Sequence, residues 1–143
     1  MSLENIDARG PRFSALLTTI VLSIALATNS ELLLALQAVV FAIGAIKGPQ
    51  ATPYSAIFRK FIKPRLKSEA KFEDIRPPQF AQRVGLGFAL VGLFGAVAAP
   101  VLFHVAVSFA LAAAFLNAAF DFCLGCQIYL LFERLRAKPA LRA

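Results

Sequence analysis

The chain has few of the residues that build most catalytic and metal sites. Its 143 residues include one histidine and two cysteines, so a zinc site with four nitrogen or sulfur ligands would need a second subunit. The sequence also contains no nucleotide-binding glycine loop, no Cys-x-x-Cys-His haem motif and no hydrolase constellation. We therefore expect no cofactor and no metal within a single copy.

Charged residues are scarce as well. Asp, Glu, Lys and Arg make up 16% of the chain, whereas 59% is hydrophobic, and the mean hydropathy is +0.71. Apolar residues run almost without interruption from Val84 to Phe132, which is membrane composition. One helix over that run would be about 73 Å long, more than twice the hydrocarbon thickness of roughly 30 Å. The chain must therefore turn back within this run.

Two shorter apolar runs, residues 13–28 and 32–46, occupy the first half of the chain. Each is near the short end for a span. A secretory signal is the weaker interpretation of the first run, because acids flank it and no small-x-small cleavage site precedes a soluble domain. The runs are too long and unalternating for barrel strands. They predict an all-α membrane protein with four transmembrane helices, in a single membrane domain over residues 1–143.

The basic residues mark one side of the membrane. All fifteen Lys and Arg lie in three places: at Arg9 and Arg12, at nine positions between Lys47 and Arg83, and at four between Arg134 and Arg142. The two short turns between the runs have none, so the positive-inside rule puts both termini and the central loop in the cytoplasm. The net charge of +7 suits anionic lipid headgroups. It does not indicate nucleic acid, because the central loop is too short for a nucleic-acid-binding module.

The sequence contains an internal duplication. The segments DARGPRFSA from Asp7 and DIRPPQFAQ from Asp74 share Asp-x-Arg-x-Pro-x-Phe, and TPYSAIFRKFIKPRL aligns with QIYLLFERLRAKPAL so that Tyr54 matches Tyr129. Each unit would hold two spans and a cytoplasmic-side amphipathic helix, and an even number of spans makes the repeats parallel. We expect tandem repeats at about residues 7–66 and 74–141.

Thr52 and Pro53 predict the start of the first amphipathic helix, as an N-cap and a proline at the first helical position. Apolar residues follow on one face and basic residues near the other, as in a helix that lies in the membrane interface. A solvated helix packed on the spans is the alternative. The apolar residues are Tyr54, Ile57, Phe58, Phe61 and Ile62, and the basic ones are Arg59, Lys60 and Lys63.

The only cysteines, Cys123 and Cys126, lie in the stretch AFDFCLGCQIYL. In the repeat alignment they stand opposite residues 49–52, at the bend between a span and its amphipathic helix, where water has access. A reactive thiol pair, a zinc site shared between subunits, a disulfide and two inert residues in a packed helix all stay open. A structural disulfide is disfavoured in the cytoplasm, where thiols are kept reduced.

A reactive thiol pair is our preferred interpretation. Asp121 is a candidate N-cap for a helix that resumes at Phe122, which would put Cys123 in the first helical turn, where backbone N–H groups favour a thiolate. The Asp121 carboxylate could accept a thiol proton or disfavour a second negative charge. Asn117 shares its helix face, and polar groups in a span are functional candidates. Gly125 would let the backbone bend or another molecule approach closely.

Other residues in the spans are expected to have structural roles. Small residues in the last two runs predict close contact between helices; they are Gly85, Gly92, Gly95, Ala114 and Ala118. Three polar residues near the outer ends of the spans are expected at the membrane surface, namely Glu31, Gln37 and His104.

The two Asp-x-Arg-x-Pro-x-Phe leads, the run FLNAAFDFCLGCQIY and the Pro-Tyr after the second span resemble a family of small bacterial membrane proteins, the domain of unknown function 4395. The resemblance covers nearly the whole chain. The family has no assigned activity that could be transferred to this chain. The association of family members with thioredoxin-like and rhodanese-like proteins implies thiol or sulfane-sulfur chemistry. The matching motif positions are Asn117, Phe122, Cys123, Gly125, Cys126 and Tyr129.

We therefore expect a multi-pass protein of the inner membrane that exchanges a disulfide or persulfide with a cytoplasmic thioredoxin-like or sulfurtransferase partner. Cys123 would attack and Cys126 would resolve the mixed disulfide. In a variant of this hypothesis, an oligomer passes a small sulfur species across the membrane. The alternative is a structural or assembly subunit of a larger membrane complex without chemistry of its own.

Overall fold

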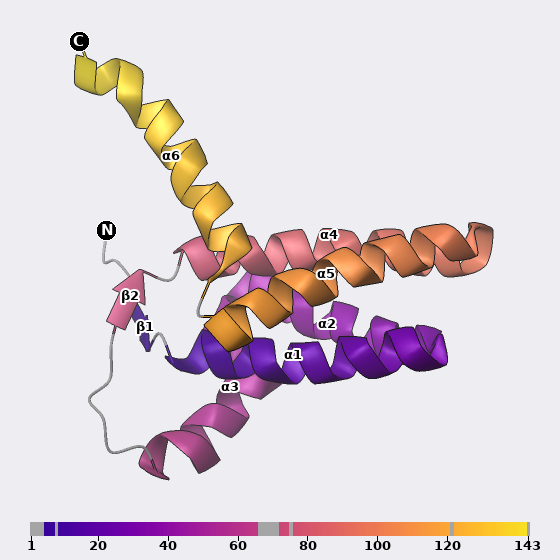
Figure 1. Cartoon of the computed structure of the whole chain (residues 1–143). Helices are drawn as coiled ribbons and strands as arrows, with labels where there is room; N and C mark the ends of the chain where they lie inside the picture. Colours follow the sequence, from indigo (N-terminus) through magenta and orange to yellow (C-terminus); the bar gives the residue numbers. More distant parts are fainter. Residues whose placement is uncertain (1–4, 8, 66–71, 75, 121, 143) are drawn as a thin grey trace.

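The computed structural model describes residues 5–7, 9–65, 72–74, 76–120 and 122–142. It is a helical structure dominated by a helical bundle (Figure 1). The bundle helices are α1 (Arg9–Thr28), α2 (Glu31–Lys47), α4 (Arg76–Ala98) and α5 (Pro100–Phe120). The short helices η1 (Pro49–Ala51), α3 (Pro53–Ile57), η2 (Phe58–Ile62) and η3 (Lys63–Arg65) follow α2, and α6 (Leu124–Arg142) follows α5. The predicted helical class is confirmed.

Capping and turn residues in the sequence set the boundaries of the bundle helices. Ser30 caps α2 by accepting a hydrogen bond from the Leu33 N–H at 3.1 Å, and Asn29 turns the chain with a φ of 52°. The long apolar run turns back at Ala99, as predicted, because Pro100 has no N–H with which to continue α4 and instead opens α5. Both hairpins are therefore encoded within a few residues.

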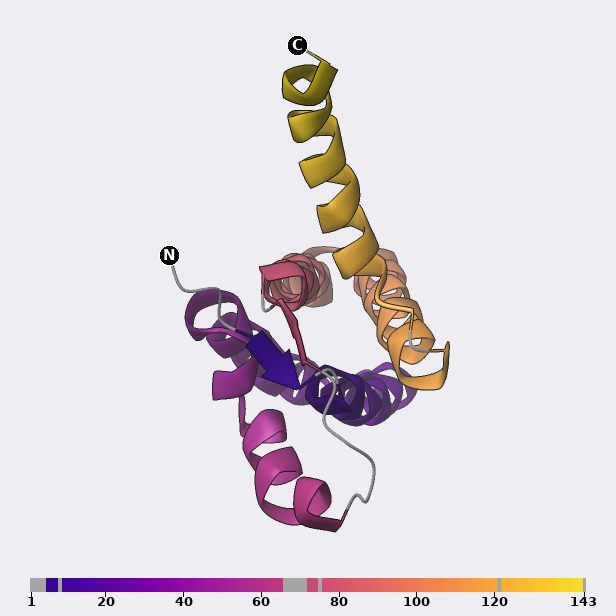
Figure 2. The same ribbon diagram turned by 90° about the vertical axis from the view of Figure 1, so that its left-hand side faces the viewer.

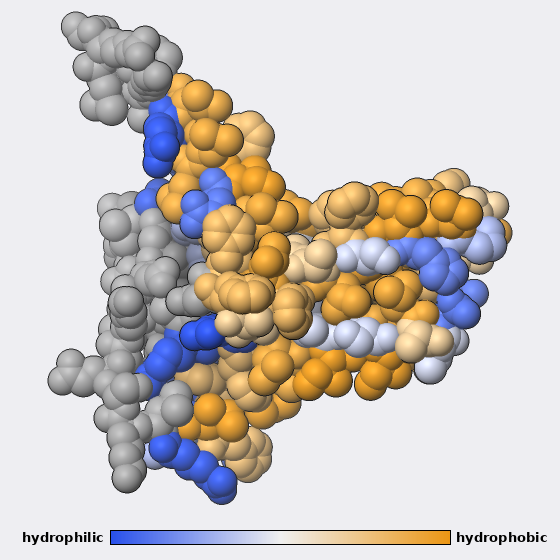
Figure 3. Space-filling view, in the orientation of Figure 1, coloured by the Kyte–Doolittle hydropathy of each residue, from blue (hydrophilic) through white to orange (hydrophobic). Residues whose placement is uncertain are grey.

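Three helices, α1, α4 and α5, are long and apolar enough to cross a membrane, which indicates a membrane protein. Helix α2 has 17 residues, or about 26 Å, slightly less than the hydrocarbon thickness. On the face that Figure 3 shows, much of the surface of the bundle is apolar. Exposed apolar side chains include Leu16, Ile20 and Ile24 on α1, Phe94 and Val97 on α4, and Val101 and Phe109 on α5.

Close contacts between helices form the core. Leu22, Leu34, Ala38, Phe41, Ala89, Phe103, Val107 and Ala110 are buried together. The expected role of the glycines on α4 is confirmed, because a Cβ at Gly85 would meet the Phe41 ring at 2.7 Å and one at Gly95 would meet the Phe103 backbone nitrogen at 2.5 Å. At Gly92 the added carbon would lie 2.9 Å from the Leu34 side chain. Small residues thus let α2 and α5 approach α4.

Gln37 lies inside the bundle and not at the membrane surface, so that prediction was wrong. It is 0% exposed, because it lies on the same face of α2 as the buried Leu34 and Phe41. Its Oε1 accepts a hydrogen bond from the Tyr54 hydroxyl at 2.7 Å, and its Nε2 donates to Thr18 Oγ1 at 3.4 Å. Burial raises the pKa of Tyr54, which keeps this hydroxyl protonated as the donor.

The short helical segment after α2 begins as predicted. Thr52 caps α3 by accepting from the Ser55 N–H at 3.2 Å, with Pro53 at the first helical position. Its apolar face is divided between two environments. Phe58 is 3% exposed and its ring centroid lies 5.8 Å from that of Phe13 on α1, whereas Phe61 is 54% exposed.

The segment α3–η3 and helix α6 leave the same end of the bundle and diverge from each other (Figures 1 and 2). We call this the basic end, because these segments carry Arg59, Lys60, Lys63, Arg65, Arg134 and Arg136. A two-stranded antiparallel ribbon, β1 (Asn5–Asp7) and β2 (Phe72–Asp74), lies there too. Its register pairs Asn5 with Asp74, Ile6 with Glu73 and Asp7 with Phe72. The segments that precede α1 and α4 are therefore neighbours, a contact that the sequence did not predict.

Candidate thiol site

Cys123 and Cys126 lie at the corner between α5 and α6, the location expected from the sequence. Their sulfur atoms are bonded to each other, and the Cα atoms are 5.1 Å apart, because residues three apart at the start of a helix lie on one side of it. The expectation that a disulfide is disfavoured was therefore wrong for this structure. A dithiol that exchanges with partners alternates between this bonded state and free thiols.

Cys123 occupies the N-cap position of α6. Its Sγ accepts a hydrogen bond from the Cys126 backbone N–H at 3.1 Å, the bond that a serine or threonine N-cap would make. The prediction that the helix resumes at Phe122 was wrong by two residues. Helix α6 begins at Leu124, and the Phe122 N–H instead donates to the Leu116 carbonyl of α5 at 3.2 Å. The Cys123 sulfur still faces the unpaired N–H groups of a helix start, which favour a thiolate.

The other two predicted site residues have different outcomes. Asp121 lies outside the described residues. Asn117 is half-buried on α5, and within the described part of the chain its side chain makes no hydrogen bond to either cysteine. Also among the described residues, no three His, Cys, Asp or Glu side chains lie together as a metal site would require.

Gly125 anchors the corner to α4. It is buried, and an added Cβ would lie 2.7 Å from both the Cα and the Cβ of Ala81. One turn further along α6, the Tyr129 ring packs on the Phe80 ring with centroids 5.6 Å apart. The close approach predicted at Gly125 is therefore made by a helix of the same chain and not by another molecule.

Both cysteines are partly exposed at this corner. The residues beside Cys123 are apolar and more exposed, with Phe122 at 42% and Leu124 at 41%. Part of the surface of each cysteine is therefore exposed in the folded bundle.

Arg12 is a residue of the corner that the sequence analysis missed. Its Nε donates to the Ala118 carbonyl at 3.1 Å and its Nη2 to the Ala119 carbonyl at 3.5 Å. A cation there also interacts favourably with the C-terminal end of α5. The available signal was its place inside the first Asp-x-Arg-x-Pro-x-Phe lead, directly before Phe13, where the second lead has Gln79.

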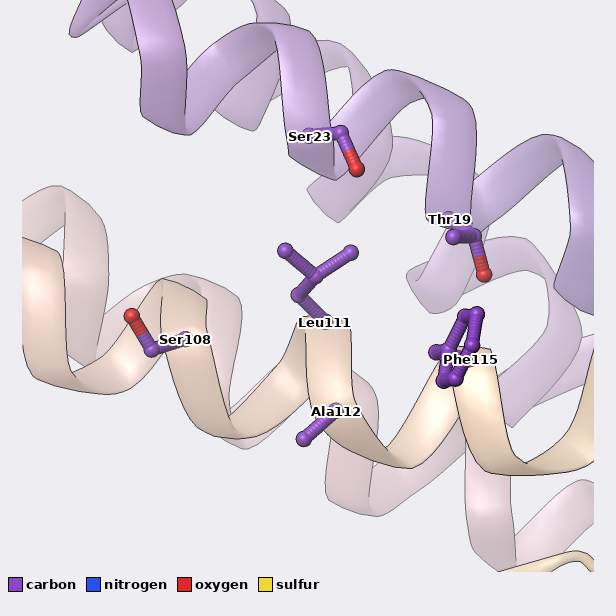
Figure 4. A pocket seen from close by; sticks show the side chains of 6 residues that line it. All are labelled: Thr19, Ser23, Ser108, Leu111, Ala112 and Phe115. Atoms are coloured by element: carbon purple, nitrogen blue, oxygen red, sulfur yellow. The ribbon is translucent and has the colours of Figure 1, made fainter.

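A groove of about 300 Å³ lies between α1 and α5, away from the cysteines. Figure 4 shows side chains from both helices around it. The lining combines hydroxyl, small and apolar side chains, which are Thr19, Ser23, Ser108, Leu111, Ala112 and Phe115. Hydroxyl and small residues of this kind mark contacts between transmembrane helices.

Comparison with known proteins identifies one family. The model described as "Domain of unknown function (DUF4395)" matches residues 6–134. No curated protein and no solved structure matches the chain.

Proposed function

The chain belongs to the DUF4395 family, and from this premise we propose that it is a membrane thiol module. Its Cys123–Cys126 pair would exchange a disulfide or persulfide with a thioredoxin-like or rhodanese-like protein. The observation that carries the proposal is a bonded, partly exposed cysteine pair at the start of a helix, at the basic end of an apolar bundle.

The exchange transfers two electrons and two protons. A thiolate of a dithiol partner attacks Cys123 Sγ, the bond to Cys126 breaks, and Cys126 leaves as a thiolate that takes up a proton. The partner's second thiol then attacks the mixed disulfide and releases Cys123, so the partner departs oxidised and the protein is left reduced. In the reverse direction the Cys123 thiolate attacks and Cys126 resolves. From a persulfide partner, the Cys123 thiolate takes the outer sulfur and the partner's thiolate leaves.

We also propose four spans in two tandem repeats related by a pseudo-twofold axis. The ribbon register supports this arrangement. The offset of 67 residues that relates Asp7 to Asp74 also relates Ile6 to Glu73, and these two residues face each other at the centre of the ribbon. Such self-equivalent antiparallel pairing is what a twofold axis generates.

Hydrogen bonds between the repeats support the same axis. Arg12 and Gln79 are separated by the same offset, and each donates to an alanine carbonyl two residues before the end of a helix. Arg12 binds Ala118 on α5, whereas Gln79 Nε2 binds Ala45 on α2 at 3.0 Å. Helix α2 is thus the counterpart of α5 and the proposed fourth span.

The proposed orientation puts the basic end in the cytoplasm of a cell whose inner membrane the bundle crosses. On α6, Leu131 and Leu135 are exposed and lie one turn apart, while Arg134 and Arg136 flank them. This pattern, like that of α3–η3, suits a helix in the membrane interface with its cations toward the headgroups.

Cysteine labelling tests this orientation. After reduction, a membrane-impermeant maleimide is expected to modify Cys123 and Cys126 rapidly in inside-out vesicles and not in intact cells. The matched control is Ala99→Cys in a Cys123→Ser/Cys126→Ser background, which should label only in intact cells because Ala99 lies at the opposite turn. The reverse pattern in both proteins would disprove the proposed sidedness.

Trapping tests the thiol chemistry itself. Cys126→Ser is expected to accumulate a mixed disulfide between Cys123 and a cytoplasmic thioredoxin-like or rhodanese-like protein, because the resolving thiol is absent. Cys123→Ser is the control and should trap about tenfold less, since the remaining Cys126 lies in the first turn of α6 and not at the N-cap, where the helix-start N–H favours a thiolate. Immunoblots without reductant and mass spectrometry of the adduct provide the measurement. Equal trapping by both variants, or none, would refute the proposal.

The competing proposal is a structural or assembly subunit. The hydroxyl-lined groove between α1 and α5 favours it, because small and polar residues there suit a neighbouring transmembrane helix. In this case the cysteines would be dispensable.

A further inference from the structure

The two repeats build the same corner with different chemistry. In the first repeat, Thr52 is the N-cap of α3 and its Oγ1 lies 3.2 Å from Ser55 Oγ, so this pair occupies the positions of Cys123 and Cys126 in the second. The caps therefore align the cysteines with residues 52 and 55, whereas the sequence alignment had set them against residues 49–52.

The hydroxyl corner is closed. Thr52 is 1% exposed and Ser55 is 3% exposed. Both hydroxyls donate to the Pro49 carbonyl, at 2.9 Å and 2.7 Å. The cysteine corner is partly exposed, as a site that meets another molecule must be.

The equivalent residues of the two leads differ in charge. Gln79 donates from a neutral amide to Ala45 at the hydroxyl corner, where Arg83 also donates at 3.4 Å, whereas Arg12 donates from a cationic guanidinium to Ala118 and Ala119 at the cysteine corner. These bonds involve two of the five N–H groups of Arg12, and its side chain is exposed.

Arg12 and Phe122, the residue before Cys123, both donate hydrogen bonds to carbonyls near the end of α5. Arg12 binds the carbonyls of Ala118 and Ala119, and the bond from the Phe122 N–H to the Leu116 carbonyl folds Phe122 back onto this end of the helix. Cys123 follows directly in the chain. The guanidinium is thus held at the corner that the sulfur atoms share.

We infer that Arg12 is a positioning residue that makes the cysteine corner selective for anionic sulfur reactants. Its hydrogen bonds hold the end of α5, and its charge attracts an anionic disulfide, thiolate or persulfide to Cys123. This inference rests on the proposed thiol function for its biological meaning, but the charge preference is a property of the corner that can be measured without a cellular partner.

The test uses full-length reduced protein in phosphatidylcholine nanodiscs and two disulfide reagents of opposite charge, anionic 5,5′-dithiobis(2-nitrobenzoate) and cationic cystamine. Arg12→Gln, which installs the residue of the other corner, is expected to slow the anionic reagent about fivefold and to leave cystamine unchanged or faster. Arg12→Lys should restore most of the anionic rate. In about 1 M salt, where the screening length is about 3 Å, the difference should vanish.

Arg83→Gln is the matched control, because Arg83 donates to Ala45 at the hydroxyl corner and its loss removes the same charge from the same end of the bundle. It should change the two rates equally and little. If Arg12→Gln slows both reagents equally, or neither, the inference is overturned. If the charge preference holds while no cellular partner is ever trapped, the proposed function fails and the role of Arg12 stands.

Discussion

Gly125→Ala, a change of one methyl group, is expected to lower the stability of the protein by about 1–3 kcal/mol, the usual cost of overpacking. The new Cβ would lie 2.7 Å from the Cα and Cβ of Ala81. Because a backbone atom cannot rotate away, α6 must shift from α4. The cysteine corner begins α6, so reduced Cys123 should also change its rate of alkylation.

Gly87→Ala supplies the matched control. Gly87 lies on α4 and is exposed, and among the described residues no atom apart from the backbone of its own helix lies within 4 Å of an added Cβ. Alanine there should stabilise the helix by about 0.5–1 kcal/mol through its higher helix propensity. Thermal unfolding of both variants in one detergent gives the comparison, and a melting temperature that rises for Gly125→Ala would show that α6 does not pack on α4 as described.

Cys123→Ser/Cys126→Ser is expected to reduce thiol exchange to background while the protein still inserts and folds. Serine at position 123 keeps the N-cap bond that Cys123 Sγ now accepts at 3.1 Å, because a serine hydroxyl is among the preferred N-caps. The lost bond closes a loop of only a few residues, for which the chain-entropy gain of a disulfide is smallest. Loss of a redox or sulfur phenotype would therefore reflect lost chemistry and not lost structure.

The same variant separates the two proposed functions. If the protein is an assembly subunit, the double serine variant should behave as wild type. Reversing the charges of Arg59, Lys60 and Lys63 on the segment after α2 should then be the harmful change. The measurements are membrane abundance by immunoblot and the growth of a deletion strain complemented by each variant under thiol stress. Full complementation by the double serine variant would eliminate the thiol module.

Several features of this protein were readable from the sequence because they are local. The apolar runs predicted the helices, the length of the run from Val84 to Phe132 predicted that it turns back, and Thr52 with Pro53 predicted the start of α3. The cysteines were expected at a corner and lie at one. Hydropathy and helix capping depend on residues within a turn or two of one another, so one chain segment carries the whole signal.

Other features depend on residues far apart in the chain. Gln37 was predicted at the membrane surface, but in the bundle it is hydrogen-bonded to Thr18 and Tyr54. Gly125 was predicted to let another molecule approach, but Ala81 of α4 occupies that position. Arg12 reaches carbonyls more than a hundred residues away. Only the packed bundle decides such partners, because a helical pattern records which face is apolar but not which helix will cover it.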